Sequence, residues 1–192
     1  MASNFYAALS RMKYITRWSL MRNTREENLS EHSYETAVIA HALAELQNRR
    51  FGGRVRVDRC VLLALYHDAS EILTGDLPTP IKYYNPALRD AYKQVEQVAA
   101  DKLLERLPDD LRDAYAPLFT ADPDEEEARL VKAADKLSAL IKCVEECGQG
   151  NREFEKARLA NEKAVRAMGI PAADCFLEEF LPAYALTLDE QE

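Results

Sequence analysis

Apolar residues recur at spacings of three and four along most of this chain, which is the period of an amphipathic helix. Strand-like alternation between turn signals is missing. A first amphipathic segment is predicted over about residues 2–13, and an irregular stretch, "TRWSLMRNTREENLS", follows it. A second helix is predicted from Ser30 to Arg50, where Gly52-Gly53 ends it. The pattern therefore predicts an all-α protein.

The third predicted helix is "RCVLLALYHDASEIL", residues 59–73, which is apolar nearly all round and is therefore expected at the centre of the fold. Asp58 is positioned to cap it, and its polar end is the segment "HDASE". The sequence "TGDLPTP" follows, and Gly75 with two prolines predicts a stiffened, non-helical loop. The remaining helices are predicted to begin near Asn85-Pro86, Pro108, Asp122-Pro123, Asn151 and Pro171.

These segments predict about seven to nine helices in one domain that spans residues 1–192. The length suits a single domain, and a composition that is 47% hydrophobic and 30% charged suits a protein with its own core. The motifs lie within about residues 15–140, and helices over residues 151–192 are expected to pack on that core. No apolar run approaches the roughly 20 residues that a membrane span requires, so no membrane partner is expected.

Charge is distributed unevenly along the chain. The net charge is −8, which disfavours a nucleic acid polymer as a partner. Five basic residues precede the first acid, Glu26: Arg11, Lys13, Arg17, Arg22 and Arg25. A small basic segment on an acidic protein suits a small anion, and a transit peptide is the alternative interpretation. The four cysteines form no C-x-x-C pair and are interpreted as buried small residues; with no secretory signal, this favours a cytoplasmic location.

The candidate chemistry begins with three histidines, His32, His41 and His67. His41 is nine residues from His32, so at about 100° per residue the two rings face opposite sides of one helix, and His41 is interpreted as a surface or packing residue. His67 and Asp68 diverge by about 100° on a helix and converge only on a point between them, which a divalent metal can occupy. Glu71 projects to the same side one turn on and is placed to hold a water beside the metal.

A mononuclear metal site needs more ligands than this pair. His32 is one candidate, and Asp135 in "VKAADKLSAL" is another, because an unpaired carboxylate among apolar and small residues is costly. Two imidazoles and two carboxylates suit Mn, Co, Fe, Ni, Zn or Cu rather than Ca. On composition alone, the alternative is that these residues are the polar ends of helices.

The order H…HD…D, formed by His32, His67-Asp68 and Asp135, resembles that of the HD-domain metal phosphohydrolases. The chain is similar to the bacterial HD-domain 5′-deoxynucleotidases in several longer segments: "SRMKYITRWSLMRN", "NLSEHSYETAVIAHALA", "NRRFGG", "ALYHDASEILTGDLPTPIKYYN" and "LVKAADKLSALIKCVEE". The resemblance runs from about residue 5 to residue 147. It implies a helical bundle of the HD type and hydrolysis of deoxyribonucleoside 5′-monophosphates to deoxynucleoside and phosphate.

The resemblance further implies one divalent transition-metal cation, Co, Mn or similar, held by four residues: His32, His67, Asp68 and Asp135. Glu71 is implied as a catalytic residue that orients or deprotonates the water or protonates the leaving 5′-oxygen. Arg17 is implied as the second catalytic residue, which orients the phosphate through its planar fork of donors. Substrate contact is implied also for three of the ligands: His32, Asp68 and Asp135.

Trp18 is implied as a wall against the sugar, because a flat apolar ring tolerates the 2′-methylene and leaves a 2′-hydroxyl unsatisfied. The loop "GDLPTP" is expected to cover the nucleoside, with Asp76 accepting hydrogen bonds from sugar hydroxyls. Leu77, Pro78 and Thr79 are expected to line the pocket, mainly through backbone, which predicts broad base tolerance. The alternatives are that Trp18 anchors the core and that the loop is a rigid connector.

The family resemblance implies a homodimer, and no site residue is assigned within residues 105–125 or 150–180. Three other functions stay open at this point. One is an HD phosphohydrolase that acts on nucleoside triphosphates or guanosine alarmones. Another is a metal-nucleotide binding protein without turnover, against which an intact Glu71 argues. The last is a plain helical scaffold that binds no metal.

Overall fold

The computed structural model describes residues 2–82 and 84–191, with the side chain of Thr79 outside the described part. These residues fold into helices, and their one β pairing is an isolated antiparallel bridge between Thr16 and Asn28. The predicted all-α class is therefore confirmed. In chain order the α-helices are α1 (Phe5–Leu9), α2 (Leu29–Arg50), α3 (Val57–Tyr66), α4 (Glu71–Thr74), α5 (Thr79–Lys82), α6 (Pro86–Leu104), α7 (Asp109–Phe119), α8 (Glu126–Gly148), α9 (Glu155–Ala167) and α10 (Pro171–Glu179).

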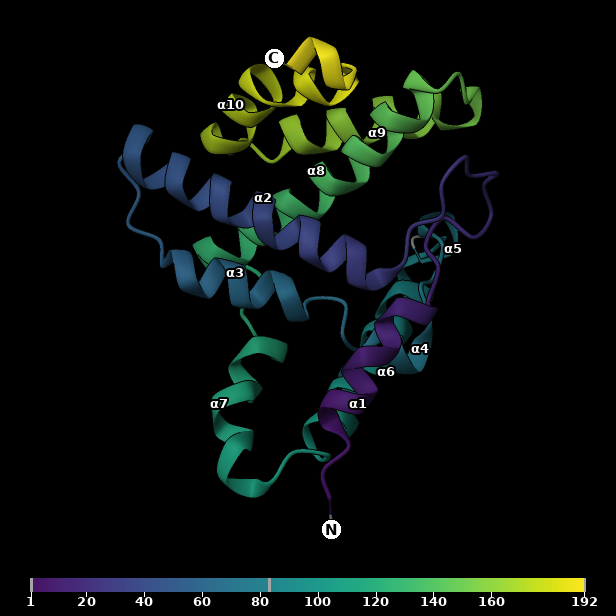
Figure 1. Ribbon diagram of the computed structural model, residues 1–192. Helices are drawn as coiled ribbons and strands as arrows, with labels where there is room; N and C mark the ends of the chain where they lie inside the picture. Colours follow the sequence, from purple (N-terminus) through teal and green to yellow (C-terminus); the bar gives the residue numbers. More distant parts are fainter. Residues whose placement is uncertain (1, 83, 192) are drawn as a thin grey trace.

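Short 3-10 helices complete the fold: η1 (Ser10–Tyr14), η2 (Arg152–Phe154), η3 (Leu181–Ala185) and η4 (Leu188–Gln191). The main core lies where α2, α3 and α8 pack on one another, and α9 and α10 cover α8 and α2 on the C-terminal side (Figure 1). Leu43 of α2, Ala64 of α3 and Leu137 of α8 are fully buried in this core. Burying such side chains provides the main driving force for packing the three helices together.

A second apolar cluster lies at the N-terminal end of the molecule, where α1 packs near α6 and α7 (Figure 1). Phe5 of α1 and Leu103 of α6 are fully buried there. Ala69, which follows His67-Asp68 directly, is also fully buried in this cluster. The apolar cluster therefore anchors the turn that carries the HD pair.

The structure corrects the helix that was predicted over residues 59–73. Helix α3 ends at Tyr66, residues 67–70 form a turn, and α4 begins at Glu71. Arg56 occupies the N-cap position of this helix without a side-chain cap, whereas Asp58 lies in its first turn. Leu62 and Leu65 are 42% and 39% exposed, so α3 is buried on one side only and is not surrounded by other helices as predicted.

Other boundaries also differ from the prediction. The segment predicted over 2–13 divides into α1 and η1, and "TGDLPTP" runs into the short helix α5 instead of staying non-helical. The second helix spans Leu29–Arg50, within one residue of the prediction. His41 is exposed, as expected from its place opposite His32. No helix in the described part of the chain has the length and apolar character needed to cross a membrane.

Candidate active site

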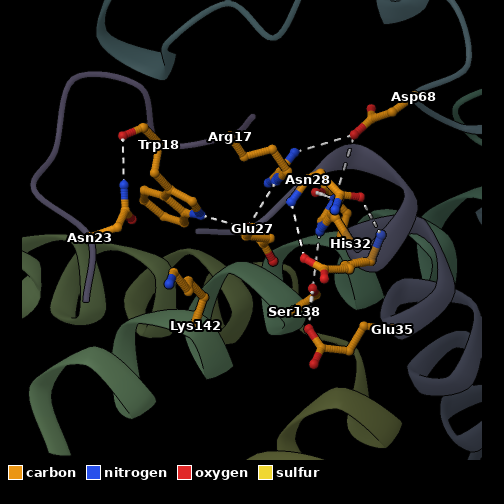
Figure 2. Close-up of polar contacts among 12 residues, drawn as sticks. Arg17, Trp18, Asn23, Glu27, Asn28, His32, Glu35, Asp68, Ser138 and Lys142 are labelled. Carbon is orange, nitrogen blue, oxygen red and sulfur yellow. Dashed lines mark hydrogen bonds and ion pairs between the residues drawn. The ribbon is translucent and has the colours of Figure 1, made fainter. Parts of the chain in front are cut away.

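The start of α2 is held by a capping box that fixes the position of His32. The side chain of Asn28 accepts hydrogen bonds from the backbone N–H groups of Ser30 and Glu31, and Glu31 accepts one from the Asn28 N–H (Figure 2). Such caps stabilise a helix end by about 1 kcal/mol. His32 lies in this first turn, faces α8 and is fully buried.

The turn after α3 brings His67 and Asp68 to the same point. The Nδ1 of His67 lies 2.7 Å from the carbonyl oxygen of Ala64, which only accepts, so Nδ1 must donate. The Nε2 of His67 lies 3.2 Å from an oxygen of Asp68. The two side chains converge because the backbone turns at this point. The uninterrupted helix assumed from the sequence is wrong, but the convergence that it was used to predict is observed.

Helix α8 supplies Asp135. An oxygen of Asp135 lies 3.3 Å from Nε2 of His32, and an oxygen of Asp68 lies 3.5 Å from the same nitrogen. Ligand atoms of His32, His67 and Asp135 all lie within 4.8 Å of one another. Residues separated by more than a hundred positions in the sequence therefore meet at one point, in the mixed nitrogen and oxygen arrangement that suits a divalent transition metal.

The hydrogen bonding of both imidazoles leaves their inward nitrogens available as ligands. Nε2 of His32 and Nε2 of His67 are buried, and within the described residues neither forms a hydrogen bond, although oxygens of Asp68 and Asp135 lie 3.2–3.5 Å away. Burial and the nearby Arg17 lower the pKa of His32, so its ring is neutral at pH 7. A buried nitrogen without a partner is costly in a protein interior, and a bound cation removes that cost. The residues present therefore fit a metal ion.

The electrostatics of the cluster also favour a positive charge at its centre. Burial opposes ionisation of Asp135, yet Lys132 and His32 hold the pKa of Asp135 well below its ordinary range. Burial lowers the pKa of His67, but Asp68 raises it by more than burial lowers it, so the pKa is raised overall. Two ionised carboxylates around a buried point stabilise a cation placed there.

A buried hydrogen-bond chain orients His32 from behind. Nδ1 of His32 lies 3.0 Å from the hydroxyl of Ser138, and that hydroxyl donates to Glu35 at 2.8 Å (Figure 2). The chain places the proton of the neutral ring on Nδ1 and the lone pair on Nε2. Ligating histidines are commonly fixed in this way by a partner on the other nitrogen. Ser138 and Glu35 were not predicted from the sequence, where only their helical spacing from Asp135 and His32 hinted at them.

Arg17 and Trp18 lie beside the cluster on the irregular stretch between η1 and α2. Arg17 contacts Asp68 at 3.4 Å and Glu27 at 3.2 Å, and the indole nitrogen of Trp18 donates to Glu27 at 2.8 Å (Figure 2). Burial lowers the pKa of Arg17, but Asp68 and Glu27 raise it more, so the guanidinium stays charged. Glu27 thus orients both residues, a role that no sequence pattern indicated.

Glu71 is buried at the start of α4, with 5% of its surface exposed. One of its carboxyl oxygens has no hydrogen-bond partner among residues 2–82 and 84–191. Burial, followed by the carboxylates of Asp68 and Asp76, raises the pKa of Glu71 to about 9. Glu71 therefore holds a proton at neutral pH. Strongly perturbed carboxyls in a cleft are typical of catalytic acids and bases.

A cavity of about 670 Å³ opens beside these residues, a size that suits a small organic ligand. Its walls include Arg17, Trp18, Asp68, Glu71 and Asp135. The loop between α4 and α5 supplies Asp76, Leu77 and Pro78, and helix α5 supplies Pro80. The side chain of Thr79 lies outside the described part of the chain. The sequence-predicted residues are thus brought together around one cavity, except that His32 and His67 lie behind its surface.

The far wall of the cavity was not predicted. It is formed by α9, from which Lys156, Ala157, Ala160 and Asn161 line the cavity. These residues fall within 150–180, where the sequence carried no recognisable motif. Lys132 and Lys136 of α8 also line it, and their spacing around Asp135 was the one available signal for them.

The raised pKa of Glu71 predicts a pH-dependent cost to stability. Between its ordinary pKa of 4.5 and the folded-state pKa of about 9, the folded protein holds a proton that the unfolded chain releases, so stability falls as pH rises. Glu71→Gln removes this cost. In chelator-treated protein at pH 8, we expect the variant to melt about 5 °C higher than wild type, as measured by calorimetry. The difference should vanish near pH 4, and a persistent difference there would contradict the assignment.

Comparison with known proteins agrees with this geometry. The fold is similar to that of an HD-domain phosphohydrolase from Listeria innocua, with a TM-score of 0.80 and 26% identity over 98% of this chain and 91% of that one. A cyanophage S-2L HD phosphohydrolase, solved with dA and one catalytic Zn²⁺ ion, has the same fold at a TM-score of 0.65 and 20% identity, over 94% of this chain and 96% of that one. The fold and the His/Asp cluster define an HD-domain phosphohydrolase.

Sequence comparison identifies the family. The family model described as 5′-deoxynucleotidase YfbR-like matches residues 4–184. The 5′-deoxynucleotidase YfbR of Salmonella newport (strain SL254) is 51% identical over 189 residues, which cover 98% of this chain and 95% of that protein. The chain therefore belongs to the YfbR-like 5′-deoxynucleotidase family, and it is a hydrolase of phosphate monoesters. The resemblance inferred from the sequence motifs is confirmed.

Proposed function

We propose that this enzyme uses one divalent metal ion to hydrolyse 2′-deoxyribonucleoside 5′-monophosphates to the deoxynucleoside and phosphate. The observation that carries the proposal is that Arg17 and the ionised Asp68 and Asp135 line one cavity, while the Nε2 atoms of His32 and His67 lie next to those carboxylates just behind its surface. The deoxyadenosine and Zn²⁺ in the cyanophage phosphohydrolase of the same fold support both the ligand class and a transition metal.

The metal would be held by four residues: His32, His67, Asp68 and Asp135. A cation such as Co, Mn or Zn supplies polarisation of the phosphoryl oxygens and a lowered pKa for a water bound to it. Asp68 and Asp135 also lie where they can contact the phosphate group, since both line the cavity. Arg17, which already contacts Asp68, binds a phosphate oxygen and orients the group for attack.

Glu71 acts in this proposal as the acid that protonates the leaving 5′-oxygen. Its buried carboxyl holds a proton at neutral pH because burial and the neighbouring Asp68 and Asp76 raise its pKa. A water oxygen forms the new bond to phosphorus as the bond from phosphorus to O5′ breaks. The electron pair stays on O5′, the Glu71 proton neutralises it, and a proton released by the attacking water restores Glu71. A correctly placed general acid of this kind contributes about 10²–10⁴-fold to a rate.

Selection of the sugar is assigned to Trp18, and placement of the nucleoside to the loop after α4. Trp18 lines the cavity with its indole nitrogen already bound to Glu27, so its ring offers no donor to a 2′-hydroxyl. Asp76 accepts hydrogen bonds from the remaining sugar hydroxyl. Leu77 and Pro78 present apolar surface that does not distinguish bases, and broad base tolerance follows.

The proposal is tested with metal-loaded protein and a panel of dAMP, dGMP, dCMP and TMP beside the ribonucleotides. Wild type should release phosphate from all four deoxynucleotides and should prefer dAMP over AMP. Trp18→Ala should lower that preference by about 10-fold or more, because a cavity replaces the wall that excludes the 2′-hydroxyl. Equal wild-type rates on AMP and dAMP would remove the sugar-selection role. Absence of phosphate release from every deoxynucleotide, or release of triphosphate from dATP, would overturn the proposed reaction.

We propose also that the enzyme is a cytoplasmic homodimer. Helix α6 supports the dimer, because its residues Leu88, Val95 and Val98 lie on one helical face and are 37%, 51% and 51% exposed. Free rather than disulfide-bonded cysteines support the location. Light scattering should give twice the chain mass of 21.8 kDa, and a monomer mass at micromolar concentration would contradict the dimer.

A further inference from the structure

The backbone at Trp18 is held in an unfavourable conformation. Its φ angle is +58°, and Trp18 is the one non-glycine residue with a positive φ in the described part of the chain. A bulky side chain in the left-handed region costs about 1–3 kcal/mol and persists only where the surroundings enforce it. The contacts that enforce it therefore determine where the indole ring lies.

The loop that carries Trp18 is held by Glu146, which is 1% exposed near the end of α8. The Thr24 N–H and hydroxyl donate to one carboxylate oxygen of Glu146 at 2.9 and 2.7 Å, and the Arg25 N–H donates to the other at 3.3 Å. Lys142 donates both to Glu146 and to the carbonyl of Arg25. The tip of the loop that carries Trp18 is thereby tied to α8.

Glu146 also holds the support beneath the indole ring. Asn151 donates to Glu146 at 2.8 Å and to the carbonyl of Arg22 at 2.7 Å, and its side-chain oxygen caps η2. Helix η2 ends in Phe154, which is fully buried with its ring centroid 5.3 Å from that of Trp18. Figure 2 shows Lys142 on the α8 side of the Trp18 ring. The same carboxylate thus holds the loop that carries Trp18 and, through Asn151, the helix η2 whose Phe154 packs against the Trp18 ring.

The position of Glu146 on α8 links this arrangement to the catalytic centre. Asp135 and Glu146 are eleven residues apart on one continuous helix, which is about three turns, so they lie on nearly the same face. Burial opposes ionisation of Glu146, but hydrogen bonds from Lys142, Thr24 and Asn151 lower its pKa to about 2. The carboxylate is therefore charged at neutral pH, and its hydrogen bonds are of the strong, charge-assisted kind.

We propose that Glu146, with Lys142, is a positioning residue that fixes the Trp18 wall relative to the Asp135 end of the cavity and so sets the discrimination between deoxyribose and ribose. The inference rests on the proposed role of Trp18. Glu146 does not line the cavity, so it acts on the substrate only through the loop and Phe154.

Trp18 is the sole tryptophan, so its fluorescence reports on this wall without any need for turnover. Glu146→Gln keeps the size of the side chain but puts an amide donor against the donors of Thr24 and Asn151. We expect the acrylamide quenching constant of Trp18 to rise about twofold or more, as in loops released from a buried partner. Glu145→Gln, the adjacent carboxylate on the same helix, should match wild type. Unchanged quenching in a folded Glu146→Gln variant would overturn the proposal.

Kinetics provide the second readout. In Glu146→Gln, the ratio of kcat/KM for dAMP to that for AMP should fall by about threefold or more, mainly through KM, with unchanged metal content. Glu146→Asp should recover part of the ratio. Thr24→Val removes one hydrogen bond and is the alternative variant if Glu146→Gln does not fold. A loss of kcat with an unchanged sugar ratio would refute the positioning role. A wild type with no sugar preference would refute the role of Trp18 instead, and the fluorescence result would still stand.

Discussion

Replacing Glu71 by glutamine is expected to lower kcat by about 10²–10⁴-fold while the metal content of the protein stays unchanged. Glutamine has the same shape but no proton to donate to the leaving oxygen. Glu71 belongs to α4 and is not among the four residues proposed to hold the metal: His32, His67, Asp68 and Asp135. Its loss should therefore affect turnover without affecting metal binding. Steady-state kinetics on dAMP and metal analysis of the same preparation check both parts.

The pH profile gives the control for this prediction. Wild-type kcat should decline as pH rises and Glu71 loses its proton. A bound cation stabilises the carboxylate, so the midpoint should lie below the pKa of about 9 that burial, Asp68 and Asp76 produce. The Glu71→Gln variant should not show this decline of kcat at high pH. A parallel loss of metal and activity would make Glu71 a ligand, and a wild-type kcat that rises across this range would make it a base.

Replacing His67 by alanine is expected to remove both the bound metal and the activity. The Nε2 of His67 is buried and lies 3.2 Å from Asp68, so its loss leaves the two ionised carboxylates with one nitrogen ligand, His32, in place of two. Because the metal supplies several kcal/mol of charge stabilisation, the rate should fall by about 10³-fold or more. Titration calorimetry with Mn²⁺ or Co²⁺ and turnover of dAMP measure the two effects.

His41→Ala is the matched control, since His41 lies on the same helix as His32 but is exposed on the opposite face. It should retain wild-type affinity and turnover. If His67→Ala bound the metal as tightly as wild type, the proposed ligand set would be wrong. If His41→Ala lost metal affinity, the exposed face of α2 would have to take part in metal binding.

The helices that the sequence predicted well are those with strong local signals. Asn28 and Glu31 form the box that starts α2, and Asn85 followed by proline starts α6. Such signals act within one turn and need no tertiary context. The third helix was predicted too long, because its apolar period continues past Tyr66 while the chain turns there to bury Ala69 between α1 and α6. That burial depends on Phe5 and Leu103, which are distant in sequence.

The sequence by itself determined the helical class, through its periodicity, and the family to which the chain belongs, through the order of its motifs. The candidate ligands and catalytic groups were predicted from residue type and from the family resemblance. Only the tertiary structure decided how those groups are oriented. Ser138 meets His32 across 106 residues, and Thr24 meets Glu146 across 122. Glu27 joins Arg17 to Trp18, and α9 closes the cavity. Contacts between distant segments depend on how whole helices pack, which no local pattern of hydrophobic and polar residues specifies.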